Sequence, residues 1–363
     1  MSSDVSRLMV EIAVRQALKN RSKQSFRRSL RTLVEYGEHY SSGPFQSNFF
    51  LVVQQMLRDD NHPYYQLAER AWTQVDNRYI EHFCLNMGYE SWTRGAATIR
   101  SLEAELNCNI PWLLTIIRSA PTGAPLAEEA IRTLMEQGMR MGIYAYLLVD
   151  CQLDTALIHR LSADYATCAL SVVSMDSRLT NEALDELEGT DNVMLIAAQD
   201  GPTFTSAPFL REHKRLYGLC TFYDSEADLA ALQNGTGMAC PGDPDCMLHF
   251  FLPRRGCNPA LRNAMDEELL RLKRQPVSAQ FPIELRRDLR HIDQIISTDD
   301  CTLAVVPSGE FYLSDPDIPT GMFVQNSSLM EVVREHLKKE GQYQSRRRAS
   351  TLCGGFSVFT YCC

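Results

Sequence analysis

The chain has 363 residues, 22% of them charged, and a formal net charge of −9. That length suffices for two or three structural units with a substantial core. The acidic balance argues against a nucleic-acid-binding surface spread over the whole molecule. The chain contains twelve cysteines, but Asp4, Arg7, Glu11 and Arg15 interrupt its first twenty residues, so we expect neither a signal peptide nor a secreted disulfide framework. No apolar run approaches the length of a membrane span, and we therefore expect a cytoplasmic protein without a membrane or nucleic-acid partner.

Residues 1–76 predict a helical N-terminal unit. Apolar residues recur there at spacings of three and four, as in Leu8, Ile12 and Leu18, which is the periodicity of an amphipathic helix. A basic cluster in this unit is typical of a solvated helix face, with a partner site as the alternative. The cluster consists of Lys19, Arg21, Lys23, Arg27, Arg28 and Arg31.

Residues 77–256 predict short strands that alternate with amphipathic helices. The expected strands are 80–85, 112–117, 143–149, 169–173, 193–197, 219–223 and 247–252. Strands that alternate with helices indicate a parallel sheet. The pattern therefore predicts an α/β fold with a partial β/α barrel, whose sites lie at the C-terminal ends of the strands. A doubly wound open sheet is the alternative.

Residues 257–363 predict a small α+β extension followed by a cysteine-rich tail. Helices are expected at 259–273, 282–296 and 327–339, with short strands at 301–306 and 311–313.

Cys84, Gly88 and Ser91 have the spacing of an iron–sulfur motif. A C-x3-C-x2-C loop supplies three thiolates to one [4Fe-4S] cluster, and two of those positions here lack sulfur. Together with Trp92, which stands where an aromatic residue often follows, the segment resembles the radical S-adenosylmethionine (SAM) family. Members of that family carry this loop just after the first barrel strand. The resemblance implies that the cluster site has lost two of its ligands.

The segment Thr122-Gly123-Ala124-Pro125 resembles the family's G-G-E-P motif. The family's acidic residue helps to hold the methionyl amine of SAM, and Ala124 stands in its place. This replacement removes the carboxylate that would make a charge-assisted hydrogen bond to the amine.

The C-terminal part resembles a SPASM-type extension. Cys301, a short apolar strand, Gly309 and Ser314 follow the order of that extension, with Ser314 in place of its second cysteine. Cys353 and the two glycines after it resemble its final cysteine and glycine pair. The resemblance thus covers residues 77–363 and leaves the N-terminal helices outside.

The candidate metal ligands are all cysteines, because thiolates suit zinc or iron. They are Cys240, Cys246, Cys257, Cys301 and Cys353. Cys240 and Cys246 have His249 nearby, but C-x5-C is looser than the usual zinc spacing. Ordinary reduced thiols in a packed core are the alternative.

The candidate cofactor-binding residues are Cys84, Arg118, Ser119 and Gly123. Arg118 and Ser119 follow the strand expected at 112–117, where Arg118 is a plausible anion contact. Several further polar residues fall at predicted strand ends, where helix capping is the simpler interpretation. They are Asp150, Ser174, Asp176, Asp200 and Asp224.

These patterns predict a radical-SAM-like barrel with a SPASM-like extension, without the usual cluster ligands and without a bound cofactor. Such a protein would be a non-catalytic or divergent member that binds a peptide or a partner enzyme in the barrel mouth. One alternative is an active iron–sulfur enzyme that uses other cysteines to bind a [4Fe-4S] cluster and cleave SAM. Another is a barrel enzyme of unrelated chemistry that uses the acids at the strand ends.

Overall fold

The computed structural model describes most of the chain between residues 3 and 339. The described residues are 3–19, 23–39, 53–54, 57–59, 61–199, 203–240, 243, 245–254, 256–276, 278–297, 301–314 and 317–339. The predicted final cysteine, Cys353, lies outside them. None of the helices in these ranges is long and apolar enough to cross a membrane.

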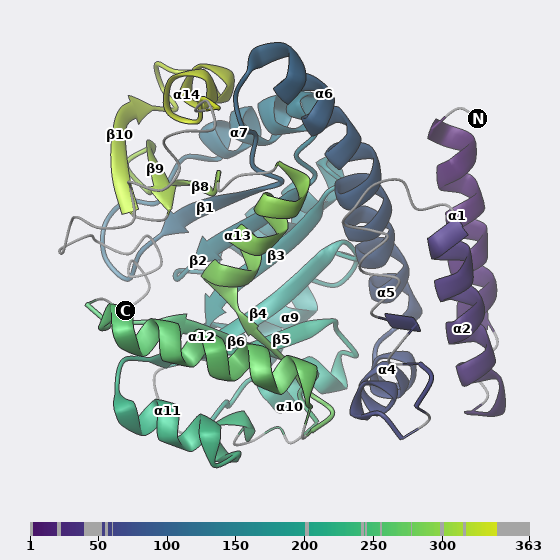
Figure 1. Ribbon diagram of the computed structural model, residues 1–363. Helices are drawn as coiled ribbons and strands as arrows, with labels where there is room; N and C mark the ends of the chain where they lie inside the picture. Colours follow the sequence, from purple (N-terminus) through teal and green to yellow (C-terminus); the bar gives the residue numbers. More distant parts are fainter. Residues whose placement is uncertain are drawn as a thin grey trace.

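A ten-stranded sheet forms the centre of the molecule (Figure 1). Its strands are β1 (Leu113–Ser119), β2 (Ala145–Asp150), β3 (Ala169–Met175), β4 (Val193–Gln199), β5 (Tyr217–Tyr223), β6 (Leu248–Pro253), β7 (Phe281–Glu284), β8 (Leu303–Val305), β9 (Glu310–Ser314) and β10 (Asp317–Phe323). Their order is β10-β9-β8-β1-β2-β3-β4-β5-β6-β7. Strands β1 to β8 are parallel, and β9 and β10 form an antiparallel hairpin at one edge. The predicted α/β class with a mainly parallel sheet is therefore confirmed.

Helices precede the sheet and connect its strands. They are α1 (Ser3–Lys19), α2 (Lys23–His39), α4 (Pro63–Gln74), α5 (Asn77–Cys84), the π-helix η1 (Leu85–Gly95), α6 (Ala96–Leu106), α7 (Glu128–Met141), α8 (Thr155–Asp164), α9 (Asn181–Glu186), α10 (Ala207–Glu212), α11 (Glu226–Gln233), α12 (Pro259–Arg274), α13 (Leu285–Ile296) and α14 (Leu329–His336). Both faces of the central strands are covered, since every residue of β1 and β2 is buried. Such coverage explains why these strands read as continuous apolar runs.

The parallel strands follow the order of an eight-stranded barrel that is open between β7 and β8. Helix α13 begins directly after β7 and ends beside the start of β1. There the backbone N of Trp112 donates to Oδ1 of Asp293 at 3.2 Å, and Oγ of Ser297 donates to the carbonyl of Ile110 at 2.8 Å. Leu285 and Leu289 belong to the same buried cluster as the strands. Helix α13 thus links the two sides of the opening, and in Figure 1 it crosses in front of the sheet.

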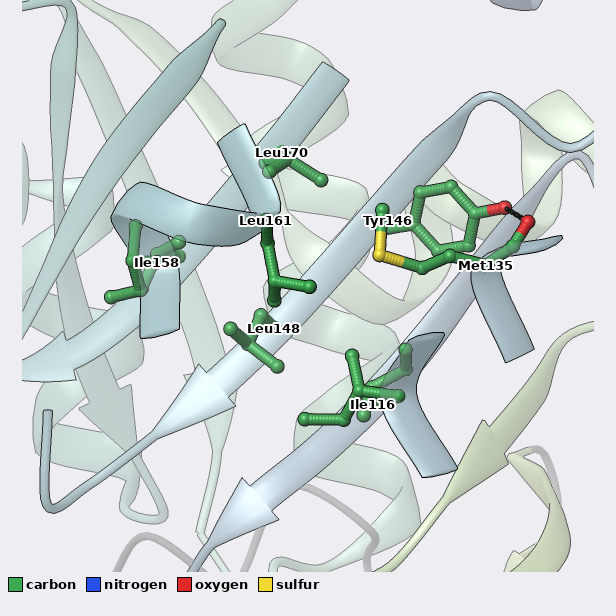
Figure 2. Close-up of a pocket in the computed structure, with 9 residues that line it drawn as sticks. Ile116, Met135, Tyr146, Leu148, Ile158, Leu161 and Leu170 are labelled. Carbon is green, nitrogen blue, oxygen red and sulfur yellow. Dashed lines mark hydrogen bonds between the residues drawn. The ribbon is translucent and has the colours of Figure 1, made fainter. Parts of the chain in front are cut away.

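The layer between the sheet and helices α7 and α8 is closely packed (Figure 2). It contains a cavity of about 10 Å³, lined by apolar side chains such as Ile116 of β1 and Leu161 of α8. The hydroxyl of Tyr146 donates to the carbonyl of Met135 at 3.0 Å. Space of this size holds about one water molecule, so we do not regard this cavity as a ligand site.

The predicted strand at 80–85 is wrong, because this segment is helical. Helix α5 ends at Cys84 and continues into η1, which contains Gly88 and Ser91. The side chain of Asp76 accepts from the backbone N of Arg78 at 2.9 Å and so starts the helix with a cap. A short apolar run fits either a strand or a buried helix, and here the cap favours the helix. The motif residues therefore do not lie in a loop after a barrel strand.

Two strands were also missed. Strand β7 has four residues and contains Pro282, and the segment 282–296 had been predicted to be entirely helical. Strand β10 contains Pro319 and Gly321, two residues that seldom mark strand interiors. The first strand of the sheet is consequently β1, and residues 120–127 follow this first strand rather than the second.

Candidate functional site

The candidate site lies at the C-terminal ends of β1 and β2, the edge at which β/α folds carry their sites. Arg118 and Ser119 end β1, and Asp150 ends β2. Ser119 and Asp150 are partners in the parallel register of these two strands. The strand pairing therefore brings together residues that are more than thirty positions apart in the chain.

An ion-pair network joins these strand ends. Nη1 of Arg118 lies 2.9 Å from Oδ1 and 3.1 Å from Oδ2 of Asp150, and its Nη2 lies 2.7 Å from Oδ2 of Asp154. The hydroxyl of Ser119 donates to Oδ1 of Asp150 at 2.5 Å. The Asp150 side chain is fully buried, whereas that of Asp154 is 36% exposed. One guanidinium thus faces two carboxylates, so the predicted free anion contact at Arg118 is already occupied by residues of the chain itself.

The segment that follows β1 folds back over this network. The backbone N of Leu126 donates to the carbonyl of Arg118 at 2.7 Å. The side-chain amide of Gln152 donates to the carbonyls of Ala120 and Gly123 at 3.2 and 3.3 Å. Residues 120–127 contain no cysteine. The structure thus places Arg118, Ser119 and Gly123 in one region.

Cys84, the fourth expected cofactor residue, belongs to a different edge of the sheet. Its neighbour Asn86 donates from its side-chain amide to the carbonyls of Ala166 and Cys168 at 2.7 and 2.9 Å, directly before β3 begins. These contacts dock η1 at the N-terminal ends of the strands. Arg118 and Ser119 lie at the C-terminal ends, so the backbone of Cys84 does not lie beside them.

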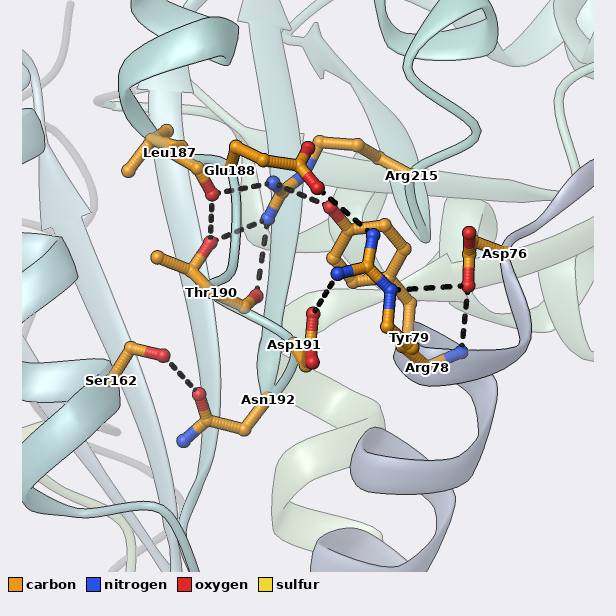
Figure 3. A network of polar contacts seen from close by, with 10 residues as sticks. All are labelled: Asp76, Arg78, Tyr79, Ser162, Leu187, Glu188, Thr190, Asp191, Asn192 and Arg215. Atoms are coloured by element: carbon orange, nitrogen blue, oxygen red, sulfur yellow. Dashed lines mark hydrogen bonds and ion pairs between the residues drawn. The ribbon is translucent and has the colours of Figure 1, made fainter. Parts of the chain in front are cut away.

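The N-terminal edge also holds a buried arginine (Figure 3). Arg215 donates to the carbonyl of Leu187 at 2.9 Å, to the hydroxyl of Thr190 at 2.8 Å and to the hydroxyl of Tyr79 at 3.1 Å. Its guanidinium lies 4.5 Å from the centre of the Tyr79 ring. Burial lowers the pKa of Arg215. The network joins helix α5 to the segments that precede β4 and β5, and its role is to hold the helix on the sheet.

Cys240, Cys246 and His249 meet beside the first residues of β6. Sγ of Cys240 lies 3.4 Å from Nδ1 of His249, and Nε2 of His249 lies 2.9 Å from Oγ1 of Thr221. A hydrogen bond from the Cys246 thiol, together with the bond to His249, lowers the pKa of Cys240 to about 6. Burial raises the pKa of Cys246. All three side chains are buried.

The other predicted metal ligands lie elsewhere. Cys257 belongs to a separate apolar cluster between β5, β6 and helices α11 and α12. Cys301 lies before β8, where burial raises the pKa of its thiol and Asp293 and Ser297 are its polar neighbours. Within the described ranges, no three His, Cys, Asp or Glu side chains form a group that could hold a metal ion. The candidate ligands that can be placed therefore occupy three places rather than one.

Two acidic residues that follow other strands make hydrogen bonds or ion pairs within the chain. Asp176 after β3 accepts from the backbone N of Thr205 and of Ser206, each at 2.9 Å, and from both hydroxyls. Asp224 after β5 lies 3.7 Å from Nε of Arg254. The hydroxyl of Ser174 is buried without a hydrogen-bond partner among the described residues, and Asp200 lies outside those residues.

A buried carboxylate at the end of β7 was missed by the sequence reasoning. Glu284 accepts from the backbone N of Arg287 at 2.6 Å and from the hydroxyl of Tyr223 at 3.3 Å. Burial, assisted by the nearby Asp266 carboxylate, raises the pKa of Glu284 to about 7. The only available signal was the capping position before α13, which the helix predicted at 282–296 obscured.

The chain was compared with known proteins. No protein-family model and no curated protein matches it. Crystal structures of SuiB from Streptococcus suis are similar in fold. The structure bound to S-adenosylmethionine has a TM-score of 0.46 at 8% identity, covering 81% of this chain and 78% of SuiB. A structure of SuiB gives a TM-score of 0.45 at 8% identity, covering 81% of this chain and 77% of SuiB. The structure bound to the precursor peptide SuiA gives 0.46 at 9%, covering 81% and 79%. A likeness of this size does not establish a family.

Proposed function

We propose that the chain is a radical-SAM-type β/α protein that holds no iron–sulfur cluster and acts as a non-catalytic binding protein for a peptide or a partner protein. One observation carries this proposal. The family resemblance places the cluster loop directly after the first barrel strand, and residues 120–127, which follow β1, contain no cysteine. A cluster at that edge needs three thiolates, and this loop supplies none.

The ion-pair network supports the same conclusion. A cluster or a methionyl group that displaced the buried Arg118–Asp150 pair at this edge would have to separate its two charges. Breaking a buried pair costs about 3–5 kcal/mol because it leaves an uncompensated charge. We conclude that this edge stabilises the fold rather than performing cluster chemistry.

The charge of this edge favours a cationic ligand. Asp150 and Asp154 outnumber Arg118, and Asp154 is the member of the network that reaches solvent. A partially exposed carboxylate attracts lysine, arginine or an amino terminus and repels a carboxylate. Peptides with basic residues are therefore the ligand class that fits.

Helix α1 supports contact with a partner protein. Two of its arginines pair with the body of the molecule, Arg7 with Glu90 at 2.7 Å and Arg15 with Glu81 at 2.5 Å. The helix also presents apolar residues to solvent. They are Leu8, Met9 and Ile12, which are 54%, 45% and 53% exposed. Grouped apolar residues on a surface are typical of protein contacts.

Anaerobic reconstitution with iron and sulfide tests whether the cluster is absent. We expect no stoichiometric iron, no cluster absorption and no 5′-deoxyadenosine from added SAM. An active radical SAM enzyme treated in parallel is the positive control. Stoichiometric iron together with 5′-deoxyadenosine would instead establish the alternative, an enzyme that binds its cluster through other cysteines.

Peptide titration tests the ligand class. Two labelled peptides of equal length, one rich in arginine and one rich in glutamate, are titrated against the chain and against Asp154→Asn. We expect the basic peptide to bind more tightly and to lose about fivefold in affinity with the variant, because a surface charge pair contributes up to roughly 1 kcal/mol. Glu136→Gln, at a side chain of α7 that is 57% exposed, is the matched control. Equal binding of both peptides would contradict the proposed ligand class.

A further inference from the structure

The N-terminal part of helix α1 is attached to the body of the molecule by a chain of ion pairs. Nε of Arg7 donates to Oε1 of Glu90 in η1 at 2.7 Å, and Nε of Arg15 lies 2.5 Å from Oε1 of Glu81 in α5. Glu11 pairs with both arginines, each at 2.8 Å. Helix α1 accordingly contacts α5 and η1, and it lies next to α5 in Figure 1. Charge therefore contributes to holding this part of α1 in place.

The C-terminal end of α1 is attached differently. Val14, Ala17 and Leu18 belong to an apolar cluster that also contains Phe26 of α2 and Trp72 of α4. Three apolar residues of the preceding turns are exposed instead, namely Leu8, Met9 and Ile12. Helix α1 thus has an apolar anchor at one end and ion pairs at the other. This is the arrangement of a strap that opens from its N-terminal end.

Glu90, the residue that Arg7 reaches, is a buried carboxylate with a free acceptor. Its side chain is 1% exposed, whereas that of Arg7 is 35% exposed. Nε of Arg94 lies 2.7 Å from Oε2 of Glu90, but no hydrogen bond to Oε2 forms among the described residues. The hydroxyl of the adjacent Ser91 is also buried and, in the same ranges of the chain, without a hydrogen-bond partner. Buried polar atoms normally have such partners, so this place has capacity for a further donor.

We infer that Glu90 is a guanidinium-binding site that α1 closes with its own Arg7. When the N-terminal part of α1 opens, an arginine of a peptide partner replaces Arg7 on the carboxylate. Arginine fits better than lysine, because its planar group donates from several nitrogens in a fixed fork and so reaches both carboxylate oxygens. Segment η1 is a π-helix, a conformation that is frequent at functional sites. The inference does not rest on the proposed peptide contact at Asp154.

The burial of Glu90 couples the opening of α1 to the arrival of a ligand. A buried carboxylate that loses a partner is left with an uncompensated charge, so opening α1 alone is unfavourable. Exchanging Arg7 for another arginine keeps the charge compensated and is therefore nearly balanced. The second pair does not prevent the exchange, because the Arg15 side chain is 53% exposed and exposed pairs contribute little in water. Arg7 thus acts as an autoinhibitory contact.

Hydrogen exchange of the full chain, followed by mass spectrometry, tests the strap. The exchange of residues 3–14 is compared with that of residues 128–141 in α7 as an internal reference. Raising the NaCl concentration from about 0.1 M to about 1 M shortens the screening length from about 10 Å to about 3 Å. We expect residues 3–14 to exchange roughly fivefold faster at high salt, relative to the reference. Exchange that does not change with salt would overturn the strap.

Peptides test the guanidinium site at the lower salt concentration. The arginine-rich peptide should speed the exchange of residues 3–14, and a lysine-rich peptide of equal length and charge should do so at least about threefold less. Equal effects of the two peptides, or no effect of either, would overturn the site. Asp154→Asn should keep the response of residues 3–14, so a failure of the contact at Asp154 and a failure of this site are distinguishable.

Variants test the autoinhibitory role of Arg7. The labelled arginine-rich peptide should bind Arg7→Gln roughly fivefold more tightly than the wild type, because it no longer competes with Arg7. Arg140→Gln removes the same charge from a side chain of α7 that is 77% exposed, and it should bind as the wild type does. Unchanged or weaker binding by Arg7→Gln would overturn this role.

Glu90→Gln should abolish the difference between the arginine-rich and lysine-rich peptides, because it removes the charge that both recognise. A difference that persists in Glu90→Gln would place the guanidinium site elsewhere. The peptide comparison in the wild type needs no substitution, so it decides the inference even if Glu90→Gln fails to fold.

Discussion

Arg118 at the end of β1 pairs with Asp150 at the end of β2, with Nη1 2.9 Å from Oδ1. The register of the two strands places Ser119 beside the same carboxylate. The pair occupies the edge where the family resemblance leads one to look for a cofactor. Because the pair is buried, we expect it to stabilise the fold.

Arg118→Ala is expected to destabilise the protein by about 3–5 kcal/mol, because it leaves the Asp150 charge buried without its partner. The free energy of unfolding in urea measures this effect. Arg140→Ala is the matched control, since its pair with Glu136 has a distance of 3.8 Å and side chains 77% and 57% exposed. That control should change the free energy by less than about 0.5 kcal/mol. Equal effects of the two substitutions would show that the pair is not structural.

Glu284 is expected to make stability fall as the pH rises. Its pKa is about 7 in the folded protein against an ordinary value of 4.5 for a glutamate, chiefly because of burial. The folded state therefore holds more protons than the unfolded state between these values. The stability that protonated Glu284 contributes is fully present below pH 4.5 and is lost as the pH rises through about 7.

The free energy of unfolding of Glu284→Gln, relative to that of the wild type, should therefore be higher at pH 8 than at pH 5 by on the order of 2 kcal/mol. Urea unfolding at the two pH values measures the difference. Glu331→Gln is the control of opposite sign, because hydrogen bonds from Ser328 lower the pKa of Glu331. A Glu284→Gln effect that does not depend on pH would contradict the raised pKa.

Arg215→Lys is expected to destabilise the protein by about 2–4 kcal/mol. A lysine cannot donate simultaneously to Leu187, Thr190 and Tyr79, so buried acceptors lose their partners. Thermal unfolding measures the loss, and hydrogen exchange should show α5 loosened first. Arg78→Lys, at a side chain 50% exposed, should have little effect. An α5 that stays protected in Arg215→Lys would mean that other contacts hold this helix.

Gly142→Ala is expected to destabilise the protein by more than Gly189→Ala. Both glycines have positive φ, at 94° and 83°, so both substitutions strain the backbone by about 1 kcal/mol. At Gly142 the added Cβ would also lie 2.6 Å from the carbonyl oxygen of Gly95, whereas nothing lies within 4 Å at Gly189. Urea unfolding of the two variants separates the backbone strain from the steric contact of the added Cβ. Similar losses of stability in both variants would show that η1 can move away from α7.

The sequence was sufficient to predict the central sheet. Strands β1 to β6 correspond to six of the predicted runs, because strands covered on both faces are apolar throughout. The strand predicted at 80–85 was wrong because its apolar residues fit either a strand or a buried helix, and the cap at Asp76 favours the helix. Strand β7 was missed because it is too short to be distinguished from the helical periodicity of α13, which follows it directly.

The sequence alone indicated several candidate site residues. They are Arg118 and Ser119, the acid at Asp150, and Cys240 and Cys246 with His249 nearby. Only the tertiary structure decided that Asp150 and Asp154 share Arg118, that Cys84 ends a helix at the other edge, and that His249 turns one nitrogen to Cys240 and the other to Thr221. The reason is physical. Apolar periodicity is a local property of the sequence, whereas contacts between strand ends depend on register and on the direction in which each side chain points.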